Sequence, residues 1–386
     1  MKPFHDRHLV LTLLLISLTI GCTQETKENT NSSGWEMSSP DVQGIDPLVI
    51  DLIHQEIQNG DYGLIDHFLL IRNGKIVSDY HYDQDYETIA KDYDTANHQY
   101  NYDHPNWHPY YNNTDQHSLQ SVSKSITSLL LGIAMDEGLI IPLDSTIAPL
   151  FSDYSFEADE RKKSITLKNL LTMQSGIQWD ESSSYAEDQS NNCTIMELSD
   201  DWIQYVLDRP MDTIPGTQFV YNSGVTVLLG KIVGMATGKR IDQWAEEKLF
   251  GPLGITQYYW KETPKGEMDT EGGLYLSAHD LAKIGYLMMN KGVWNNQQIV
   301  SEEWVTASIQ PTFKFNEQRG YGYQWWVPAY QDEQVKIFAG NGYGGQFVMM
   351  APEYNMLVVF NGWNIHDRAE KSTWNVLQDR ILPGLN

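Results

Sequence analysis

Ser121 and Lys124 stand three residues apart, immediately before the long apolar run of residues 125–135. On a helix, residues three apart share a face, so the Lys124 amine would lie beside the Ser121 hydroxyl. A serine hydroxyl needs an adjacent base to become a nucleophile, and a lysine is such a base only where burial and neighbouring positive charge lower its pKa. A helix N-terminus would also stabilise a developing oxyanion. The pattern predicts an activated serine.

The Ser-x-x-Lys pattern is weak in isolation. A chain of 386 residues contains on the order of one such pattern by chance. The simpler interpretation makes Ser121 the N-cap of an ordinary amphipathic helix, with its hydroxyl accepting a hydrogen bond from a backbone N–H. The choice between nucleophile and cap depends on motifs elsewhere in the chain.

The composition is typical of a globular protein with a large core. Of the 386 residues, 41% are hydrophobic and 12% aromatic. The net charge is -25, the pI is about 4.6, and no stripe of Lys and Arg occurs, which argues against a nucleic-acid partner. We therefore expect no nucleic-acid partner, which leaves a small-molecule substrate among the possibilities. The composition leaves the oligomeric state open.

Residues 1–21 have the layout of a secretory signal peptide. Lys2 and Arg7 precede an apolar run over residues 9–18, which is too short to span a bilayer comfortably. We expect an exported protein.

Gly21 and Cys22 end this run and resemble a bacterial lipobox, in which the cysteine is cleaved and lipidated, although Thr19 stands where Leu is usual. Residues 22–45 are mostly polar and are expected to form a flexible tether. The prediction is a cell-envelope lipoprotein, periplasmic or outer-membrane anchored, that meets the membrane only through its lipid. The alternative is an ordinary secreted protein cleaved elsewhere.

Neither the cysteines nor the histidines predict a metal site. A lipidated Cys22 leaves Cys193 without a disulfide partner, and Cys193 has no metal-ligand spacing, so we expect a structural thiol. Four histidines lack a paired carboxylate or cysteine at a recognised spacing: His98, His104, His108 and His117. We expect neither a metal nor an organic cofactor.

Elements at both ends of the chain favour a mixed α/β (α+β) fold. A helix over 47–58 is followed by a hairpin whose turn contains Asn73-Gly74. The predicted fold is an antiparallel sheet built from N- and C-terminal segments, flanked by helices, with a mostly helical lobe over about 121–260, in one domain of residues 46–386. Further helices are expected over 167–173, 195–207, 224–235, 241–249, 278–288, 302–309 and 368–381, strands over 321–328, 335–339, 346–350 and 356–360, and a long loop over 83–116.

Two later segments make the Ser-x-x-Lys pattern specific. They are residues 215–230, which contain Tyr221-Asn222-Ser223, and the glycine-rich residues 338–347. Together with Ser121 and Lys124, they resemble in order and spacing the motifs of the serine β-lactamase and penicillin-binding-protein-like hydrolase superfamily. The likeness is to the class C-like branch of esterases and 6-aminohexanoate-dimer hydrolases.

This resemblance implies a β-lactamase/transpeptidase-like fold and a role for each motif. Ser121 would be the acylated nucleophile, Lys124 its base or base partner, and Tyr221 the phenol of the second motif. A nearby ammonium stabilises a phenolate, so Lys124 and Tyr221 could share one mobile proton. The pair could deprotonate Ser121, protonate the leaving group and activate water.

The resemblance also implies an oxyanion hole. Its two donors would be the N–H of Ser121 and an N–H of the third motif, which maps to Tyr343 or, with a shift of one residue, to Gly344. Gly342 would allow the strand to approach the substrate closely. The alternative is that this glycine-rich segment is only a tight turn.

Two departures from the superfamily pattern affect the substrate. Ser223 replaces the asparagine whose amide would hold a substrate carbonyl. The usual Lys or His of the third motif is absent, since Gly340 or Asn341 stands in its place. That cation contacts a substrate carboxylate, so its absence argues against β-lactams and D-alanyl termini.

Aromatic residues are candidates for an acyl pocket, although core packing is the default for each: Trp179, Tyr185, Trp325 and Trp326. Asp180 and Glu181 are expected to be solvated loop charges.

The sequence therefore predicts a secreted serine hydrolase that cleaves a carboxylic ester or amide through an acyl-enzyme on Ser121. One alternative is a peptidoglycan D,D-peptidase or β-lactamase. A non-enzymatic alternative is a surface-tethered binding protein with the same fold.

Overall fold

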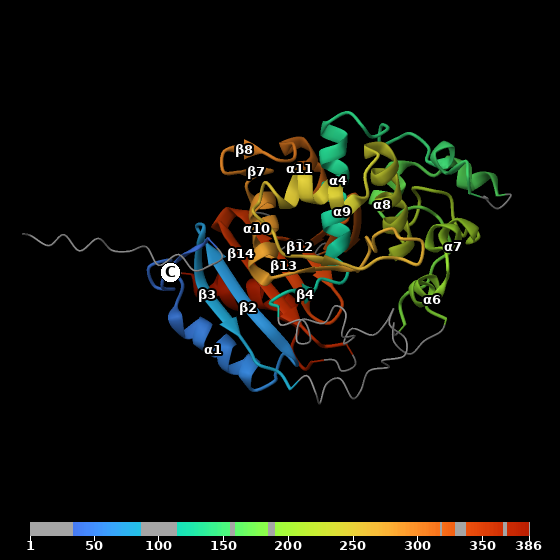
Figure 1. Cartoon of the computed structure of the whole chain (residues 1–386). Coiled ribbons are helices and arrows are strands. Elements are labelled where there is room, and N and C mark those ends of the chain that lie inside the picture. Colours follow the sequence, from blue (N-terminus) through green and yellow to red (C-terminus); the bar gives the residue numbers. More distant parts are fainter. Residues whose placement is uncertain are drawn as a thin grey trace, which may run out of the picture.

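The computed structural model describes residues 34–85, 114–154, 159–183, 190–316, 319–328, 337–365 and 369–385. Its centre is one large sheet with helices on both faces (Figure 1). The predicted mixed α/β architecture is confirmed. Cys22 and the signal segment, His98, His104 and His108, and most of the expected loop over 83–116 lie outside the described residues.

The large sheet joins the two ends of the chain. Its strands are β1 (Glu36–Met37), β2 (Ile65–Arg72), β3 (Lys75–His81), β9 (Phe313–Asn316), β10 (Arg319–Tyr321), β11 (Trp326–Pro328), β12 (Phe338–Gly342), β13 (Gln346–Ala351) and β14 (Met356–Gly362). They lie in the order β1-β3-β2-β14-β13-β12-β11-β10-β9. All neighbours are antiparallel except β1 and β3. N-terminal β2 thus pairs directly with C-terminal β14, as predicted.

The β2–β3 hairpin forms where the sequence predicts it. Asn73 and Gly74 take φ values of 53° and 73°, the left-handed conformation that a tight hairpin turn requires. His67 of β2 lies opposite His81 of β3, and Leu69 lies opposite Asp79. These four residues therefore share one face of the sheet.

Each face of the sheet is covered by a separate hydrophobic cluster. Helix α1 (Pro47–Gln58) packs with the C-terminal segment on one face, where Ile53, Phe68 and Leu377 are buried together. On the other face, α10 (Ala278–Met289) and α4 (Val122–Asp136) pack against the sheet, and the other helices of the lobe lie beyond them (Figure 1). The helix that begins after Ser121 is therefore clamped between two layers.

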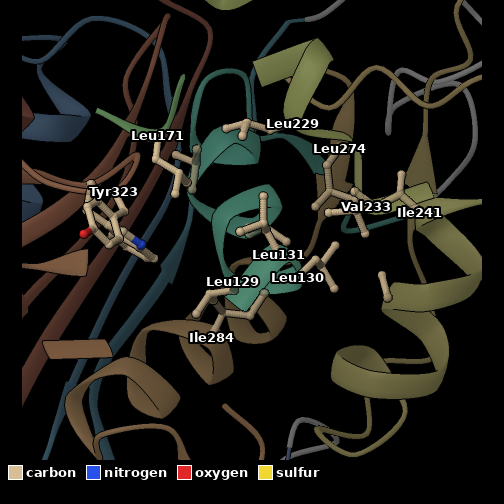
Figure 2. Packing of buried hydrophobic residues seen from close by; sticks show 14 of the residues in the cluster. Leu129, Leu130, Leu131, Leu171, Leu229, Val233, Ile241, Leu274, Ile284 and Tyr323 are labelled. Atoms are coloured by element: carbon tan, nitrogen blue, oxygen red, sulfur yellow. The ribbon is translucent and has the colours of Figure 1, made fainter. Parts of the chain in front are cut away.

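Helix α4 is the central element of the lobe. Figure 2 shows its Leu129, Leu130 and Leu131 surrounded by side chains from neighbouring elements, including Leu229 and Ile284. The helix is buried on all sides, which fixes its N-terminus rigidly. Helices α8 (Ser223–Thr237) and α9 (Ile241–Ala245) pack directly against it. The other helices of this part of the chain are α5 (Leu167–Leu171), α6 (Asn192–Leu198), α7 (Trp202–Asp208) and α11 (Glu302–Ser308).

Three predicted elements differ from the structure. The helix expected over 195–207 is two helices, α6 and α7, because Asp201 caps a new helix by accepting from the N–H of Gln204. The strand expected over 321–328 is split between β10 and β11. The closing helix expected over 368–381 is one continuous helical segment from Thr373, made of a 3-10 turn (Thr373–Asn375), a π-helical turn (Leu377–Ile381) and a last 3-10 turn (Leu382–Gly384). The helix over 47–58 is confirmed to the residue.

A small second sheet leads into the nucleophile segment. Strand β6 (Leu274–Leu276) lies between β4 (His117–Ser118) and β5 (Tyr259–Trp260). Because β6 continues directly into α10, the segments before Ser121 and before α10 are fixed side by side. Within the described ranges, no helix combines the length and the apolar character needed to cross a membrane.

Candidate active site

Ser121 lies at the first turn of α4 and does not act as a helix cap. Its side chain makes no capping hydrogen bond; its Oγ accepts a hydrogen bond from Lys124 Nζ at 2.8 Å. The preceding Gln120 has φ of 48°, a conformation that costs free energy for a residue with a side chain and is typical of active sites. The geometry favours the nucleophile over the N-cap.

All three protons of the Lys124 ammonium have acceptors. Besides Ser121 Oγ, Lys124 Nζ donates to the backbone oxygen of Glu271 and to Glu271 Oε2, each at 2.8 Å. The Lys124 side chain is 1% exposed and that of Glu271 is 6% exposed, so this is a buried ion pair. A lysine in this state holds the serine in place and has no lone pair to receive a proton.

Tyr221 joins the pair from the segment just before α8. Asn222 caps that helix by accepting from the N–H of Val225 at 3.1 Å, which fixes the direction of the chain at Tyr221. The Tyr221 ring centroid is 5.3 Å from Lys124 Nζ, and the Ser121 side chain is close enough to lower the pKa of Tyr221. The three predicted catalytic side chains therefore converge, although Tyr221 is 100 residues after Ser121 in the chain.

The charges around Lys124 are not those expected from the sequence. Burial is the largest single effect on the pKa of Lys124 and lowers it. The acidic groups around the ammonium, Glu271 foremost, together outweigh burial and raise the pKa well above the ordinary lysine value. Desolvation likewise raises the pKa of Tyr221, although the Lys124 ammonium opposes that shift. The expectation of a lysine with a lowered pKa is wrong for this state of the enzyme, and the physical reason is the Glu271 carboxylate.

Glu271 is a site residue that the sequence analysis missed. It lies 147 residues after Lys124 and immediately precedes Gly272-Gly273. Asp269 Oδ1 accepts from the N–H groups of Glu271 and Gly272 at 3.2 and 3.0 Å, which shapes this turn. An acidic residue before a Gly-Gly pair was the only sequence sign, and nothing in it indicates a lysine partner.

The polar face of α4 docks the Glu271 segment. Thr127 Oγ1 donates to the Thr270 carbonyl at 2.9 Å, and Ser123 Oγ accepts from the N–H of Leu274 at 3.2 Å. These bonds flank Glu271 on both sides. They explain why an otherwise apolar helix buries hydroxyl side chains around Lys124.

Further buried acids surround Glu271. Burial raises the pKa of Glu197 well above its ordinary value and raises that of the Cys193 thiol as well. Cys193 Sγ lies 3.5 Å from Glu271 Oε1. For Glu271, burial raises the pKa, but the Lys124 charge and side-chain hydrogen bonds together outweigh burial and lower the pKa to about 2. Glu271 is thus the ionised member of the group, and Cys193 is a protonated, buried thiol rather than a nucleophile.

Glu181 is not the solvated loop charge that we expected. Its carboxylate is buried and accepts from Trp179 Nε1 at 2.6 Å and from the N–H and Oγ of Ser223 at 3.0 and 3.1 Å. Burial raises the pKa of Glu181 to about 7. Ser223 is 1% exposed, so its hydroxyl serves this carboxylate and does not replace the missing asparagine amide.

The third motif lies against the start of α4. A Cβ on Gly342 would come within 2.3 Å of the Leu119 carbonyl, and one on Gly340 within 2.9 Å of Val122 Cγ1. Only glycine permits β12 to come this close to the start of α4. At Gly340, where the superfamily usually has a cation, there is therefore no room for a side chain. Tyr343 and Gly344 form the turn after β12, with the Tyr343 hydroxyl donating to the Ile365 carbonyl at 2.7 Å. Their part in an oxyanion hole remains a prediction.

The predicted aromatic residues divide into two groups. Trp326 stacks on Tyr221 with 5.9 Å between ring centroids and is partly exposed. Trp325 is fully buried and belongs to the core, and Trp179 is the buried partner of Glu181. Tyr185 lies outside the described residues. Trp326 is therefore the one of the four that flanks the site in the described ranges.

Comparisons with known proteins agree with this geometry. The Beta-lactamase family matches residues 68–378. A 6-aminohexanoate-dimer hydrolase of Paenarthrobacter ureafaciens is 27% identical over 292 residues, covering 69% of this chain and 71% of that protein. An N-acetylmuramyl-L-alanine amidase of Bacillus subtilis (strain 168) is 23% identical over 263 residues, covering 55% of this chain and 59% of that protein.

Solved structures share the fold at low sequence identity. A family VIII carboxylesterase superimposes with a TM-score of 0.62 at 15% identity, covering 87% of this chain and 96% of that one. A penicillin-binding protein homologue from Pyrococcus abyssi superimposes with a TM-score of 0.59 at 17% identity, covering 86% and 78%. The β-lactamase/transpeptidase-like fold is confirmed.

Replacing Glu271 by Gln should destabilise the protein. The change leaves the Lys124 ammonium buried without its carboxylate, which we expect to reduce the free energy of unfolding at pH 7 by about 3 kcal/mol. Glu267→Gln is a matched control, because Glu267 pairs with Lys231 where both side chains are about 30% exposed, and its loss should be under about 1 kcal/mol. Urea denaturation measures both. Equal losses would contradict the buried ion pair.

Glu181 should make stability depend on pH in a defined direction. Its pKa in the folded protein, about 7, is above the ordinary 4.5, so its protonated form stabilises the fold below pH 4.5 and this contribution is lost as the pH rises through 7. Glu181→Gln cannot ionise, so its unfolding free energy relative to wild type should increase by up to about 3 kcal/mol between pH 5 and pH 8. Denaturation at the two pH values measures this; a pH-independent difference would contradict it.

Proposed function

Because the chain belongs to the β-lactamase family and is a hydrolase of that fold, we propose that Ser121 attacks a carboxylic ester or amide and forms an acyl-enzyme that water then hydrolyses. The observation that carries this proposal is the contact of Ser121 Oγ with Lys124 Nζ at 2.8 Å beside the Tyr221 phenol. The relatives include an amide hydrolase and an esterase structure, so either bond is consistent with the site.

The proton of Ser121 passes to Tyr221 in this proposal. Lys124 is already an ammonium with three acceptors, so it cannot receive a proton without first giving one up. Tyr221 lies beside Ser121 and Lys124, and its minor phenolate form is a strong base that the Lys124 charge stabilises. The Ser121 oxygen then bonds to the substrate carbonyl carbon as its proton moves to the phenolate.

The same phenol completes the cycle. Tyr221 gives the proton to the leaving alcohol or amine as the acyl bond breaks, and the phenolate that results takes a proton from the incoming water. The water oxygen attacks the acyl carbon, and the proton returns to Ser121 as the acid product leaves. Lys124 stays charged throughout the cycle and holds the Ser121 and Tyr221 side chains next to each other.

The surroundings of the site favour a substrate with an apolar or aromatic group. The place of the usual third-motif cation is closed at Gly340, and Asn341 lies on the other face of β12, in a cavity that Trp326 and Arg319 also line. Beside Tyr221, Trp326 stacks on Phe315, which is 42% exposed. A β-lactam or D-alanyl carboxylate would find no partner at Gly340. We therefore place the peptidase and β-lactamase alternatives second.

Export remains part of the proposal on sequence grounds alone. The charged and apolar segment of residues 1–21 and the Gly21-Cys22 pair support a lipid-anchored envelope protein.

Hydrolysis of a short-chain p-nitrophenyl ester tests the proposed nucleophile. The wild type should release a burst of p-nitrophenol equal to the enzyme concentration, and Ser121→Ala should abolish it, because no other hydroxyl contacts Lys124 Nζ in the described residues. Tyr221→Phe, which keeps the ring, should reduce kcat/KM at least about 100-fold.

Ser128→Ala is the matched control for this experiment. Ser128 lies on the same helix, and its buried hydroxyl has no hydrogen-bond partner among the described residues. This variant should keep the burst and the turnover. A burst of wild-type size from Ser121→Ala would refute the proposed nucleophile.

A further inference from the structure

Two histidines and an aspartate converge away from the catalytic side chains. His67 comes from β2, Asp79 from the neighbouring β3 and His279 from the first turn of α10. The register of the hairpin puts His67 and Asp79 on the face of the sheet that α10 covers. Three separate elements therefore bring their polar side chains to one point.

The three side chains are aimed at each other through their donor atoms. His67 Nε2 lies 2.7 Å from Asp79 Oδ1, and His279 Nε2 lies 2.8 Å from Asp79 Oδ2. The two imidazole rings are 5.4 Å apart at an angle of 85°. One ligand atom from each residue lies within 4.8 Å of the other two. The carboxylate is thus held between two Nε2 atoms.

We propose that His67, Asp79 and His279 bind one divalent transition-metal ion of the Zn²⁺ type. Imidazole nitrogen and carboxylate oxygen are the ligands that Zn²⁺ takes in proteins, with bonds of roughly 2.0–2.2 Å. In such a site the ion takes the place of the two hydrogen-bonded protons, and both imidazoles bind as neutral ligands. The side chains need only a small outward movement to admit it.

A fourth ligand for a tetrahedral ion is also available beside the three side chains. His81 faces His67 across the hairpin, with ring centroids 5.7 Å apart, and is exposed. Either a water molecule or the His81 ring, after rotation of its side chain, completes the coordination. The three ligand side chains are 14–21% exposed, so an ion has a path from solvent. The net charge of -25 also favours cation binding.

The proposed ion is structural and has no part in the acylation chemistry. Residues 271–279 carry Glu271 of the active site at one end and His279 at the other. Between them lies β6, which pairs with β4 just before Ser121. An ion at His279 would tie the start of α10 to the β2–β3 hairpin and so stabilise this junction. It uses none of the four histidines considered from the sequence.

Titration of the untagged protein with ZnCl₂ in a calorimeter tests the site. The wild type should bind one Zn²⁺ per chain, and saturating Zn²⁺ should raise Tm by roughly 3 °C or more. His279→Gln and Asp79→Asn should each weaken binding at least about 100-fold, while the ester burst is unchanged. His54→Gln is the matched control, because His54 lies on α1 and contacts Tyr82 outside the cluster.

Two results would overturn the proposal. One is the absence of saturable binding to the wild type, and the other is wild-type affinity in either the His279→Gln or the Asp79→Asn variant. If a variant does not fold, the Co²⁺ spectrum of the wild type decides. Intense visible bands of four-coordinate Co²⁺ without a thiolate charge-transfer band support the site, whereas the weak spectrum of hydrated Co²⁺ overturns it.

Discussion

The buried ion pair between Lys124 and Glu271 is the interaction on which the rest of the site depends. An ammonium excluded from water is tolerated only when its charge and its three protons are satisfied, and Glu271 supplies a carboxylate and a carbonyl while Ser121 supplies the third acceptor. Removing either partner of the pair leaves the other charge uncompensated. Ser121, the proposed nucleophile, is therefore positioned by the same bonds that make burial of the lysine possible.

The packing around α4 holds Lys124 and Glu271 in the positions that their ion pair needs. Helix α4 is surrounded by apolar packing, so its first turn cannot relax toward solvent, and the hydroxyls of Ser123 and Thr127 dock residues 270–274. On the other side of the site, β12 approaches the segment before Ser121 closely at Gly342. A buried carboxylate also fixes the second motif, because Glu181 accepts hydrogen bonds from Ser223 at the N-terminus of α8. A rigid hydrophobic layer thus supports a polar site with little freedom to rearrange.

Local patterns predicted the parts of this protein that depend on local physics. The Asn73-Gly74 hairpin, the helix over 47–58 and the helix that follows Ser121 each follow from turn chemistry or periodicity, and the three catalytic candidates came from short motifs. Glu271 and Glu181 could not be predicted, because their roles arise from partners 147 and 42 residues away. A loop carboxylate is normally solvated, and only the tertiary packing reverses that expectation. The closing segment is helical from Thr373, but in 3-10 and π turns, which an apolar pattern alone does not distinguish from an α-helix.

The protonation state of Lys124 tests the central claim most directly. In protein labelled with ¹³C at the lysine Cε, the resonance assigned by comparison with a Lys124→Arg variant can be followed by NMR as the pH is raised. The account predicts that this resonance keeps the shift of a charged lysine up to and beyond pH 10.5, because Glu271 raises its pKa above that ordinary value. Loss of the charge below pH 10.5 would contradict the account. It would mean that neutral Lys124 is available as the base that deprotonates Ser121.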